Sequence, residues 1–216
     1  MSEPAGPKGL ADPLALEHRR MLALEAPHLG PLGPYLAALR AAHGEVPDPD
    51  PLDGGAEARL LLLLEAPGPR IRRSGLVSRD NPSGTAANLH RFLAEAGLPR
   101  RDTLIWNAVP WVIHAPGALN RTPTRAEVAA GLATLPGLLA ALPALRAVVL
   151  AGRVAGGAAP FLVKHRPDLR VLSMPHPSPT YVCTSPDVAA RIRAALAEAA
   201  EALGVGHPLP ALEPQA

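Results

Sequence analysis

Four short apolar runs alternate with segments of helical periodicity, and this alternation limits the folds that are open to the chain. Runs of this kind, followed by helical segments, are typical of buried parallel strands joined by crossover helices. We therefore expect an α/β protein, a three-layer α/β/α sandwich around a central four-stranded parallel sheet. The expected strands cover residues 59–65, 103–108, 146–151 and 169–173, and the expected helices cover residues 85–97, 124–141, 153–164 and 186–203.

Capping signals support the starts of three of these helices. Thr85 can cap the helix expected over residues 85–97. Thr124 and Glu127 have the spacing of a capping box, in which each side chain bonds the backbone of the other residue. Ser185, directly before Pro186, gives the last helix its start.

Two helical patterns and a proline-rich stretch precede the first expected strand. Leucines recur at helical spacing over residues 11–26 and 32–43. Residues 46–55 contain prolines that forbid a helix and glycines that end a strand, so we expect a linker there. The expected organisation is a helical extension with its linker packed on the core (1–57), an α/β domain (58–204) and a disordered tail (205–216).

The composition is that of a single-domain protein without a membrane segment. A chain of 216 residues can bury a sizeable core, and no apolar run approaches the ~20 residues that span a bilayer. The first residues lack the order of a signal peptide, so we expect a cytoplasmic protein. The single cysteine, Cys183, excludes an internal disulfide and a four-cysteine cluster, and the histidines show no metal-binding spacing. We expect neither a metal nor another cofactor.

Charge is distributed unevenly along the chain. Residues 1–57 hold nine acidic and four basic residues, whereas the rest holds ten acidic and seventeen basic residues. A basic region suits a phosphate backbone, because such affinity comes largely from Lys and Arg displacing counterions. The alternative is an arginine-rich surface that serves only solubility.

An amide and an imidazole stand at the ends of two expected strands. Asn107 ends the run at 103–108, and His176 follows the run at 169–173. Ligand sites of open α/β sheets lie at the carboxyl ends of the strands. An amide offers an acceptor and a donor side by side, which suits the edge of a base. An imidazole can donate to an oxygen that becomes negative in a transition state, so the pair indicates a site that binds a base and breaks a bond.

Three motifs resemble those of the uracil-DNA glycosylase superfamily, in the order of that family and over about residues 59 to 200. They are Leu-Leu-Leu-Leu-Glu-Ala-Pro-Gly (61–68), Leu-Ile-Trp-Asn-Ala-Val (104–109) and His-Pro-Ser-Pro (176–179). The first has the Glu-x-Pro-Gly form of the iron-sulphur members, although the cluster cysteines are missing. The resemblance implies a monofunctional DNA repair glycosylase that flips out uracil, or a related deaminated base, and hydrolyses its N-glycosidic bond.

The resemblance also implies roles for single residues. Asn107 would hold the uracil edge, and His176 would donate to the oxygen that gains charge as the base leaves. Ala66 stands where other members carry an aspartate, so either Glu65 or Asp80 would position the attacking water. The remaining residues expected to line the base pocket are Ala66, Pro67, Gly68 and Asn81.

Contacts to DNA are expected mainly from the long loop that follows the first strand. Arginines in this loop would meet phosphates, with a solvated arginine loop as the alternative. Tyr181 would enter the emptied base stack, with a core tyrosine as the alternative. The expected DNA-contacting residues are Arg70, Arg72, Arg73, Arg79, Arg121, Ser178 and Tyr181. The partner would be DNA containing uracil or another deaminated base, bound by a monomer without a membrane.

Two other functions are compatible with the sequence. The missing aspartate is compatible with a DNA-binding protein that recognises a damaged or extruded base with little or no cleavage. A glycosylase for another deaminated base, such as hypoxanthine or xanthine, is also compatible with the motifs.

Overall fold

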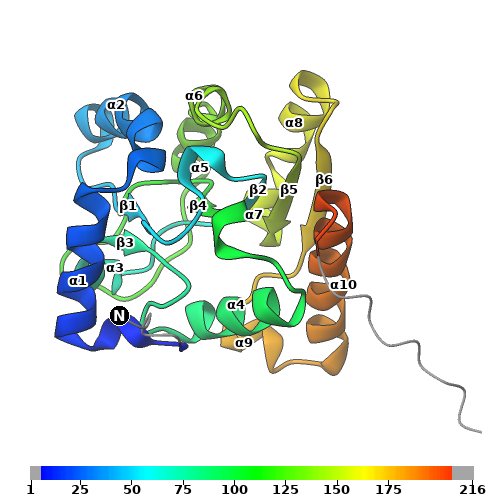
Figure 1. The fold of residues 1–216 in the computed structure, drawn as a ribbon, viewed down its shortest axis with the longest axis horizontal. Helices are drawn as coiled ribbons and strands as arrows, with labels where there is room; N and C mark the ends of the chain where they lie inside the picture. Colours follow the sequence, from blue (N-terminus) through cyan, green and yellow to red (C-terminus); the bar gives the residue numbers. More distant parts are fainter. Residues whose placement is uncertain (1–5, 206–216) are drawn as a thin grey trace, which may run out of the picture.

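Four parallel strands form the centre of the protein, whose computed structural model describes residues 6–205 (Figure 1). Their order in the sheet is β4-β2-β5-β6. The predicted four-stranded parallel sheet is therefore confirmed, and each strand end lies within one residue of its predicted place. The strands are β2 (Leu60–Leu64), β4 (Thr103–Asn107), β5 (Ala147–Ala151) and β6 (Arg170–Met174).

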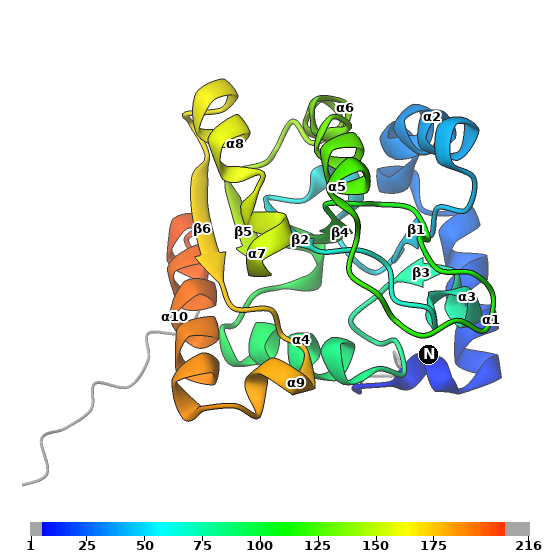
Figure 2. The same ribbon diagram turned by 180° about the vertical axis from the view of Figure 1, so that it is seen from behind.

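Helices cover both faces of this sheet, as predicted. Figures 1 and 2 show α4 (Gly84–Glu95) and α10 (Pro186–Leu203) on one face and α5 (Arg125–Leu132), α7 (Gly152–Gly156) and α8 (Ala159–His165) on the other. Short helices lie at α3 (Ile71–Ser74), α6 (Leu135–Ala140) and α9 (Pro179–Val182), and 3-10 turns lie at Gly9–Ala11, Pro27–Leu32, Gly55–Glu57 and Arg100–Asp102.

Two predicted helices are each divided in two by a proline. The helix expected over 124–141 is split into α5 and α6, and the one expected over 153–164 into α7 and α8. A proline ring clashes with the carbonyl four residues earlier. Pro136 would meet the carbonyl of Leu132, the last residue of α5, and Pro160 would meet that of Gly156, the last residue of α7.

Two of the three predicted caps are confirmed. Thr124 and Glu127 form the capping box, with distances of 3.2 and 2.7 Å between the bonded atoms. The Ser185 hydroxyl accepts from the backbone N–H of Asp187 at 3.1 Å. The prediction for Thr85 was wrong, because α4 begins at Gly84 and the cap is Ser83, two residues before Thr85. The Ser83 hydroxyl accepts from the backbone N–H of Ala86 at 3.1 Å.

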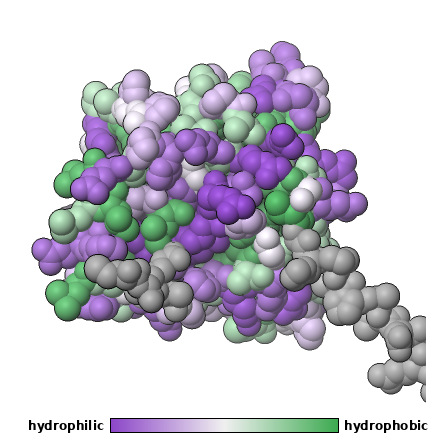
Figure 3. All heavy atoms as spheres, viewed as in Figure 1, coloured by the Kyte–Doolittle hydropathy of each residue, from purple (hydrophilic) through white to green (hydrophobic). Residues whose placement is uncertain are grey.

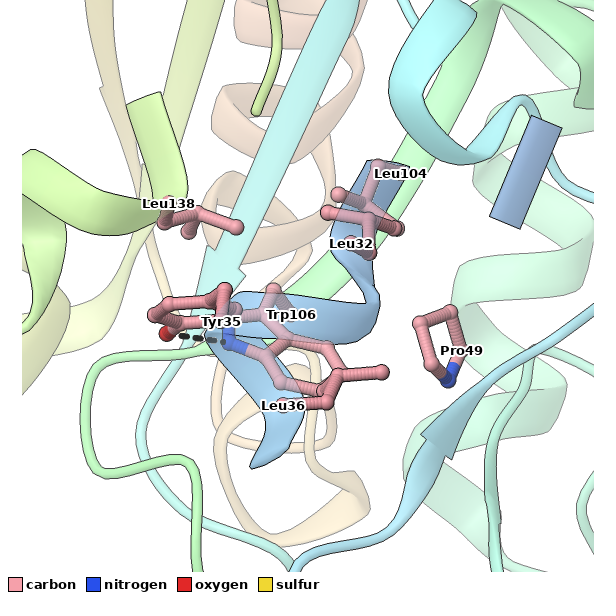
Figure 4. Close-up of a pocket in the computed structure, with 7 residues that line it drawn as sticks. All are labelled: Leu32, Tyr35, Leu36, Pro49, Leu104, Trp106 and Leu138. Carbon is pink, nitrogen blue, oxygen red and sulfur yellow. Dashed lines mark hydrogen bonds between the residues drawn. The ribbon is translucent and has the colours of Figure 1, made fainter. Parts of the chain in front are cut away.

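The edge strand β4 is buried because the N-terminal helices cover it. Helix α2 (Gly33–His43) packs against it, and the Tyr35 hydroxyl accepts a hydrogen bond of 3.2 Å from Nε1 of Trp106 (Figure 4). The gap beneath this contact is apolar and too tight to hold a water molecule. Trp106 is 1% exposed and is a core residue. The gap is lined by Leu32, Tyr35, Leu36, Pro49, Leu104, Trp106 and Leu138.

Helix α1 (Pro13–Leu24) carries large apolar side chains that are exposed. Leu14, Met21 and Leu24 are 75%, 61% and 87% exposed. Figure 3 shows hydrophobic residues among hydrophilic ones on the side where α1 lies. No helix within residues 6–205 is long and apolar enough to cross a membrane.

Residues 46–55, where we expected a linker, include a short strand. Within them β1 (Asp48–Pro49) pairs in parallel with β3 (Leu76–Val77), and two carboxylates, Asp50 and Asp53, are buried. These carboxylates have charged partners elsewhere in the chain, which the local effect of the prolines could not reveal. The division into an extension, a domain and a tail stays a prediction, and residues 206–216 of the tail lie outside the described residues.

A buried ion network fastens the N-terminal segment to the rest of the protein. Arg19 of α1 donates to Asp50 at 2.6 Å and to Asp80 at 3.0 Å. Arg100 donates to the same two carboxylates at 2.9 and 2.7 Å. Ser78 also donates to Asp50. Because each carboxylate meets two guanidinium groups, the charges compensate one another in the interior.

Asp53 extends the network but is less well paired. Its Oδ1 accepts from Nε of Arg100 at 3.1 Å and lies 3.4 Å from Nη2 of Arg79. Its Oδ2 has no hydrogen-bond partner among the described residues. Burial raises the pKa of Asp53 to about 7, although the charge of Arg79 acts against that rise. At neutral pH this carboxyl group is therefore only partly ionised.

Replacing Arg100 should destabilise the protein strongly. Arg100→Ala leaves three buried carboxylates short of a partner, and breaking a buried ion pair typically costs about 3–5 kcal/mol. The midpoint of urea unfolding should fall accordingly. Arg101→Ala is the matched control, because that neighbouring side chain is exposed and should tolerate the change. An Arg100→Ala midpoint equal to that of the parent would contradict a stabilising network.

Candidate functional site

The polar residues of the predicted site follow strands that end at the same carboxyl edge of the sheet. Leu64 of β2 stands beside Asn107 of β4 in the strand register, and Glu65 follows directly. The last residues of β5 and β6, Ala151 and Met174, are paired. Gly152 directly follows β5, and His176 comes two residues after β6. The structure therefore brings Glu65, Asn107 and His176 to one edge, where open α/β sheets hold their ligands.

Asn107 is held by its backbone and leaves its amide available. The chain on either side is tied to β2, because the N–H groups of Ala108 and Val109 donate to the carbonyls of Leu64 and Glu65 at 2.8 and 2.9 Å. Asn107 is 5% exposed, and its side chain makes no hydrogen bond to the described part of the chain. The amide atoms are not fully enclosed, so a ligand that supplies both a donor and an acceptor can reach them.

His176 is neutral and has a defined tautomer. The backbone N–H of Ser178 donates to its Nδ1 at 3.2 Å, so the ring carries its proton on Nε2. Burial lowers the pKa of His176 below its ordinary value. The result is an uncharged imidazole with an Nε2–H available to donate.

Gly152 permits the close approach of β5 to the His176 loop. Its φ is +84°, a conformation that favours glycine. A Cβ at this position would lie 3.0 Å from Cβ of His176. The glycine therefore sets how near the imidazole lies to the end of β5.

Glu65 directly follows β2 and places a carboxylate at the carboxyl end of that strand. It is half-buried, and burial raises its pKa, whereas the charge of Arg153 acts in the opposite direction. A carboxyl group with a raised pKa is a stronger base than an exposed one. After it, Ala66 is half-buried, Pro67 is buried and Gly68 is exposed, with open space where a Cβ would be.

Asp80 occupies a different place from the one expected for a water-positioning residue. Its Oδ2 accepts from Arg19 and Arg100, and its Oδ1 lies 3.2 Å from Nδ1 of His90. Burial alone would raise the pKa of Asp80, but these two arginines lower it. Both oxygens are thus engaged in the ion network. Sequence spacing could not reveal this, because the partners lie far away in the chain.

Asn81 is partly engaged. Its Nδ2 donates to the carbonyl of Leu76 at 2.8 Å, while its Oδ1 is buried and has no partner among the described residues. It therefore keeps one acceptor for a ligand or a water molecule.

The arginines expected to contact DNA fall into two groups. Arg70 and Arg73 are exposed. Arg72 donates to Glu45 and to the carbonyl of His114, both at 2.7 Å. Arg79 is 4% exposed beside Asp53, and Arg121 forms a fork with Glu127 at 2.6 and 2.8 Å. The prediction of phosphate contacts is therefore corrected for Arg79, which is buried, and Arg72 and Arg121 already have partners.

Tyr181 and Ser178 lie beside the imidazole. Tyr181 on α9 is 58% exposed, so the alternative of a core tyrosine was wrong, and its ring centroid is 6.5 Å from that of His176. Ser178 is half-buried, and its hydroxyl lies 2.9 Å from that of Thr180.

Sequence reasoning missed several residues around this edge. Gly152 and Arg153 follow the apolar run at 146–151, so the rule that found Asn107 could have found them. Asn88 on α4 and the buried His114 gave no signal in the sequence. Their importance depends on contacts with segments far away in the chain.

Comparisons with known proteins bear on the same part of the chain. The family model described as the uracil DNA glycosylase superfamily matches residues 51–200. A solution NMR structure of a Methanosarcina acetivorans protein, provisionally named a uracil DNA glycosylase, is similar with a TM-score of 0.44 and 17% identity, covering 68% of this chain and 92% of that chain. This structural likeness is too weak to transfer a function. No curated protein matches the chain.

Adding a methyl group at Gly152 should disturb His176. Gly152→Ala forces an L residue into a left-handed conformation, at a cost of about 1–2 kcal/mol. It also pushes against the imidazole, so the NMR signals of the His176 ring should shift while the fold persists. Gly156→Ala in the same helix is the control, because nothing lies within 4 Å of its Cβ position. Unchanged His176 signals in Gly152→Ala would contradict the described contact.

Proposed function

The chain belongs to the uracil DNA glycosylase superfamily, and on this premise we propose that it excises uracil from DNA as a monofunctional glycosylase. It would act in base excision repair, flip the target nucleotide out of the duplex and leave an abasic site. We further propose that it acts as a monomer in the cytoplasm and requires no cofactor.

The observation that carries this proposal is that an unengaged amide and a neutral imidazole both stand at the carboxyl edge of one sheet. Asn107 is buried without a hydrogen-bond partner in the described chain, and His176 has an Nε2–H to donate. A uracil edge offers an acceptor and a donor, which an amide matches in one orientation. Cytosine presents a donor where uracil presents an acceptor, so the same amide would discriminate between the two bases.

The bond-breaking step requires stabilisation of a departing anion. As the bond between the sugar C1′ and the base nitrogen breaks, its electron pair moves into the ring and onto a carbonyl oxygen. His176 would donate its Nε2–H to that oxygen, and such a preorganised donor typically contributes about 2.7–4 kcal/mol. A neutral donor is suitable here, because it keeps its proton while the charge develops.

Water completes the reaction at C1′. Glu65 would accept a proton from the water molecule while the water oxygen bonds to C1′. The products would be an abasic site in the DNA and the released base. The raised pKa of Glu65 supports this role. Ala66, Pro67, Gly68 and Asn81 would line the base pocket beside it.

The surface around the site carries groups suited to DNA. Arg70 and Arg73 are exposed and would contact phosphates of the DNA. Ser178 would also contact the DNA backbone. Tyr181 is exposed next to His176 and would fill the space that the flipped base leaves.

A binding protein with little or no cleavage is the second candidate. Ala66 offers no carboxylate, and Asp80 is engaged with Arg19 and Arg100, which leaves Glu65 alone to activate water. A protein of this kind would still flip and hold the base. Excision of another deaminated base would use the same mechanism, but the edge of that base would make different hydrogen bonds with Asn107.

Uracil excision and its dependence on two residues test the proposal. The parent should convert a labelled oligonucleotide with one uracil into a product that alkali cleaves. His176→Ala should lower the single-turnover rate about 100- to 1000-fold with little change in DNA affinity. Asn107→Asp should weaken uracil excision, because a carboxylate offers only acceptors. Tight binding without an alkali-labile product would favour the second candidate, and products from other lesions in a panel would redefine the base.

Variants of Glu65 and Asp80 can distinguish a carboxylate that takes part in the reaction from one that stabilises the fold. Glu65→Gln should lower the excision rate about 100-fold while the unfolding midpoint changes little. Asp80→Asn should instead lower the unfolding midpoint, because it weakens the pairing with Arg19 and Arg100, with a smaller effect on the rate of the folded protein. A Glu65→Gln protein that excises uracil at the parental rate would remove Glu65 from the mechanism.

A further inference from the structure

We infer that Asn88, on helix α4, is a positioning residue that fixes the tautomer of His176 through the peptide group between Pro177 and Ser178. The inference rests on the proposed role of His176 in excision. Asn88 lies outside the three motifs and does not follow any strand of the sheet.

Two hydrogen bonds meet on the same peptide group. Nδ2 of Asn88 donates to the carbonyl oxygen of Pro177 at 2.9 Å. The N–H of Ser178 belongs to that same planar unit and donates to Nδ1 of His176 at 3.2 Å. Because the carbonyl and the N–H cannot turn independently, the Asn88 contact determines where the N–H points. The peptide group therefore transmits the position of α4 to the imidazole.

The loop is also held by packing on both sides. A Cβ on Gly84, at the start of α4, would lie 2.3 Å from Cγ of Pro179, so the helix and the loop are in close contact there. On the other side, the backbone of Gly152 lies against His176. These contacts leave the loop little freedom to translate, but a peptide plane can still rotate between them. Asn88 contributes the specific bond that opposes this rotation.

The tautomer matters because only one of the two neutral forms can do the proposed chemistry. With the proton on Nε2, the ring presents a donor to the leaving base. If the Ser178 N–H turns away, Nδ1 loses its donor and the proton can move to it. Nε2 would then present a lone pair to an oxygen that is becoming negative, which is repulsive. The excision rate should fall in proportion to the population of the competent form.

Asn88→Asp is the decisive variant, because it keeps the shape of the side chain and replaces the donor with an acceptor. Asn88→Ala is the second variant and removes the group altogether. Thr85→Ala, one turn earlier on α4, is the control, because the Thr85 hydroxyl makes no hydrogen bond to the His176 loop in the described part of the chain. NMR of the imidazole nitrogens reports which of them carries the proton, with the His176 signals assigned by their loss in His176→Gln.

The parent and Thr85→Ala should show His176 with Nδ1 unprotonated and Nε2 protonated. Both Asn88 variants should show a mixture of tautomers, or a shift toward protonated Nδ1. This measurement requires no enzymatic activity. An inactive parent would contradict the proposed function, but the tautomer of His176 could still be measured and would still test the inference. If Asn88→Asp does not fold, Asn88→Ala supplies the same readout. A parental tautomer in every folded Asn88 variant would overturn the inference.

Single-turnover kinetics give a second, independent result. Asn88→Asp should lower the excision rate about tenfold or more without a matching loss of DNA affinity. In a His176→Ala background the same change should have almost no effect, because a residue that acts only through His176 has nothing left to position. An Asn88 penalty that persists undiminished in the His176→Ala protein would show that the residue supports the fold in general, and would contradict the inference.

Discussion

The five leucines of β2 must be buried on both sides of the sheet, and much of the architecture follows from this requirement. Each of these residues is at most 9% exposed, and burying one leucine side chain is favourable by about 1.5–3 kcal/mol. Both faces of the strand therefore need a helical layer, and both of its edges need a partner strand. Since β4 and β5 pair with β2 in parallel, their ends align with Glu65, and the polar residues meet at one edge.

The uneven charge of the sequence has in part an internal explanation. Asp50 and Asp53 belong to the acidic segment, yet they are buried against Arg79 and Arg100 of the basic region. Some of the positive charge that composition assigns to a DNA-binding surface is thus consumed inside the protein. The available surface charge is better judged from exposed residues such as Arg70, Arg73 and Arg153.

Sequence reasoning predicted the sheet well because its signals are local. Apolar runs placed the strands to within one residue, and their ends led to Asn107 and His176. The role of Asp80 was not accessible in this way, since its partner Arg19 is 61 positions away. Asn88 was missed for the same reason, because its contact with Pro177 joins residues 89 positions apart. Patterns of neighbouring residues report burial, whereas pairing between distant polar groups depends on the assembled fold.

Both tryptophans of the chain lie within four residues of Asn107, Trp106 in β4 and Trp111 beyond its end, and this makes the intrinsic fluorescence a local signal. Trp106 directly precedes Asn107 and donates to Tyr35, while Trp111 stacks on His43 with ring centroids 3.6 Å apart. Each indole therefore emits from a distinct environment on one side of the candidate site. A ligand that alters the end of β4 would change most of the emission of the protein, so its binding could be followed by spectroscopy without any attached label.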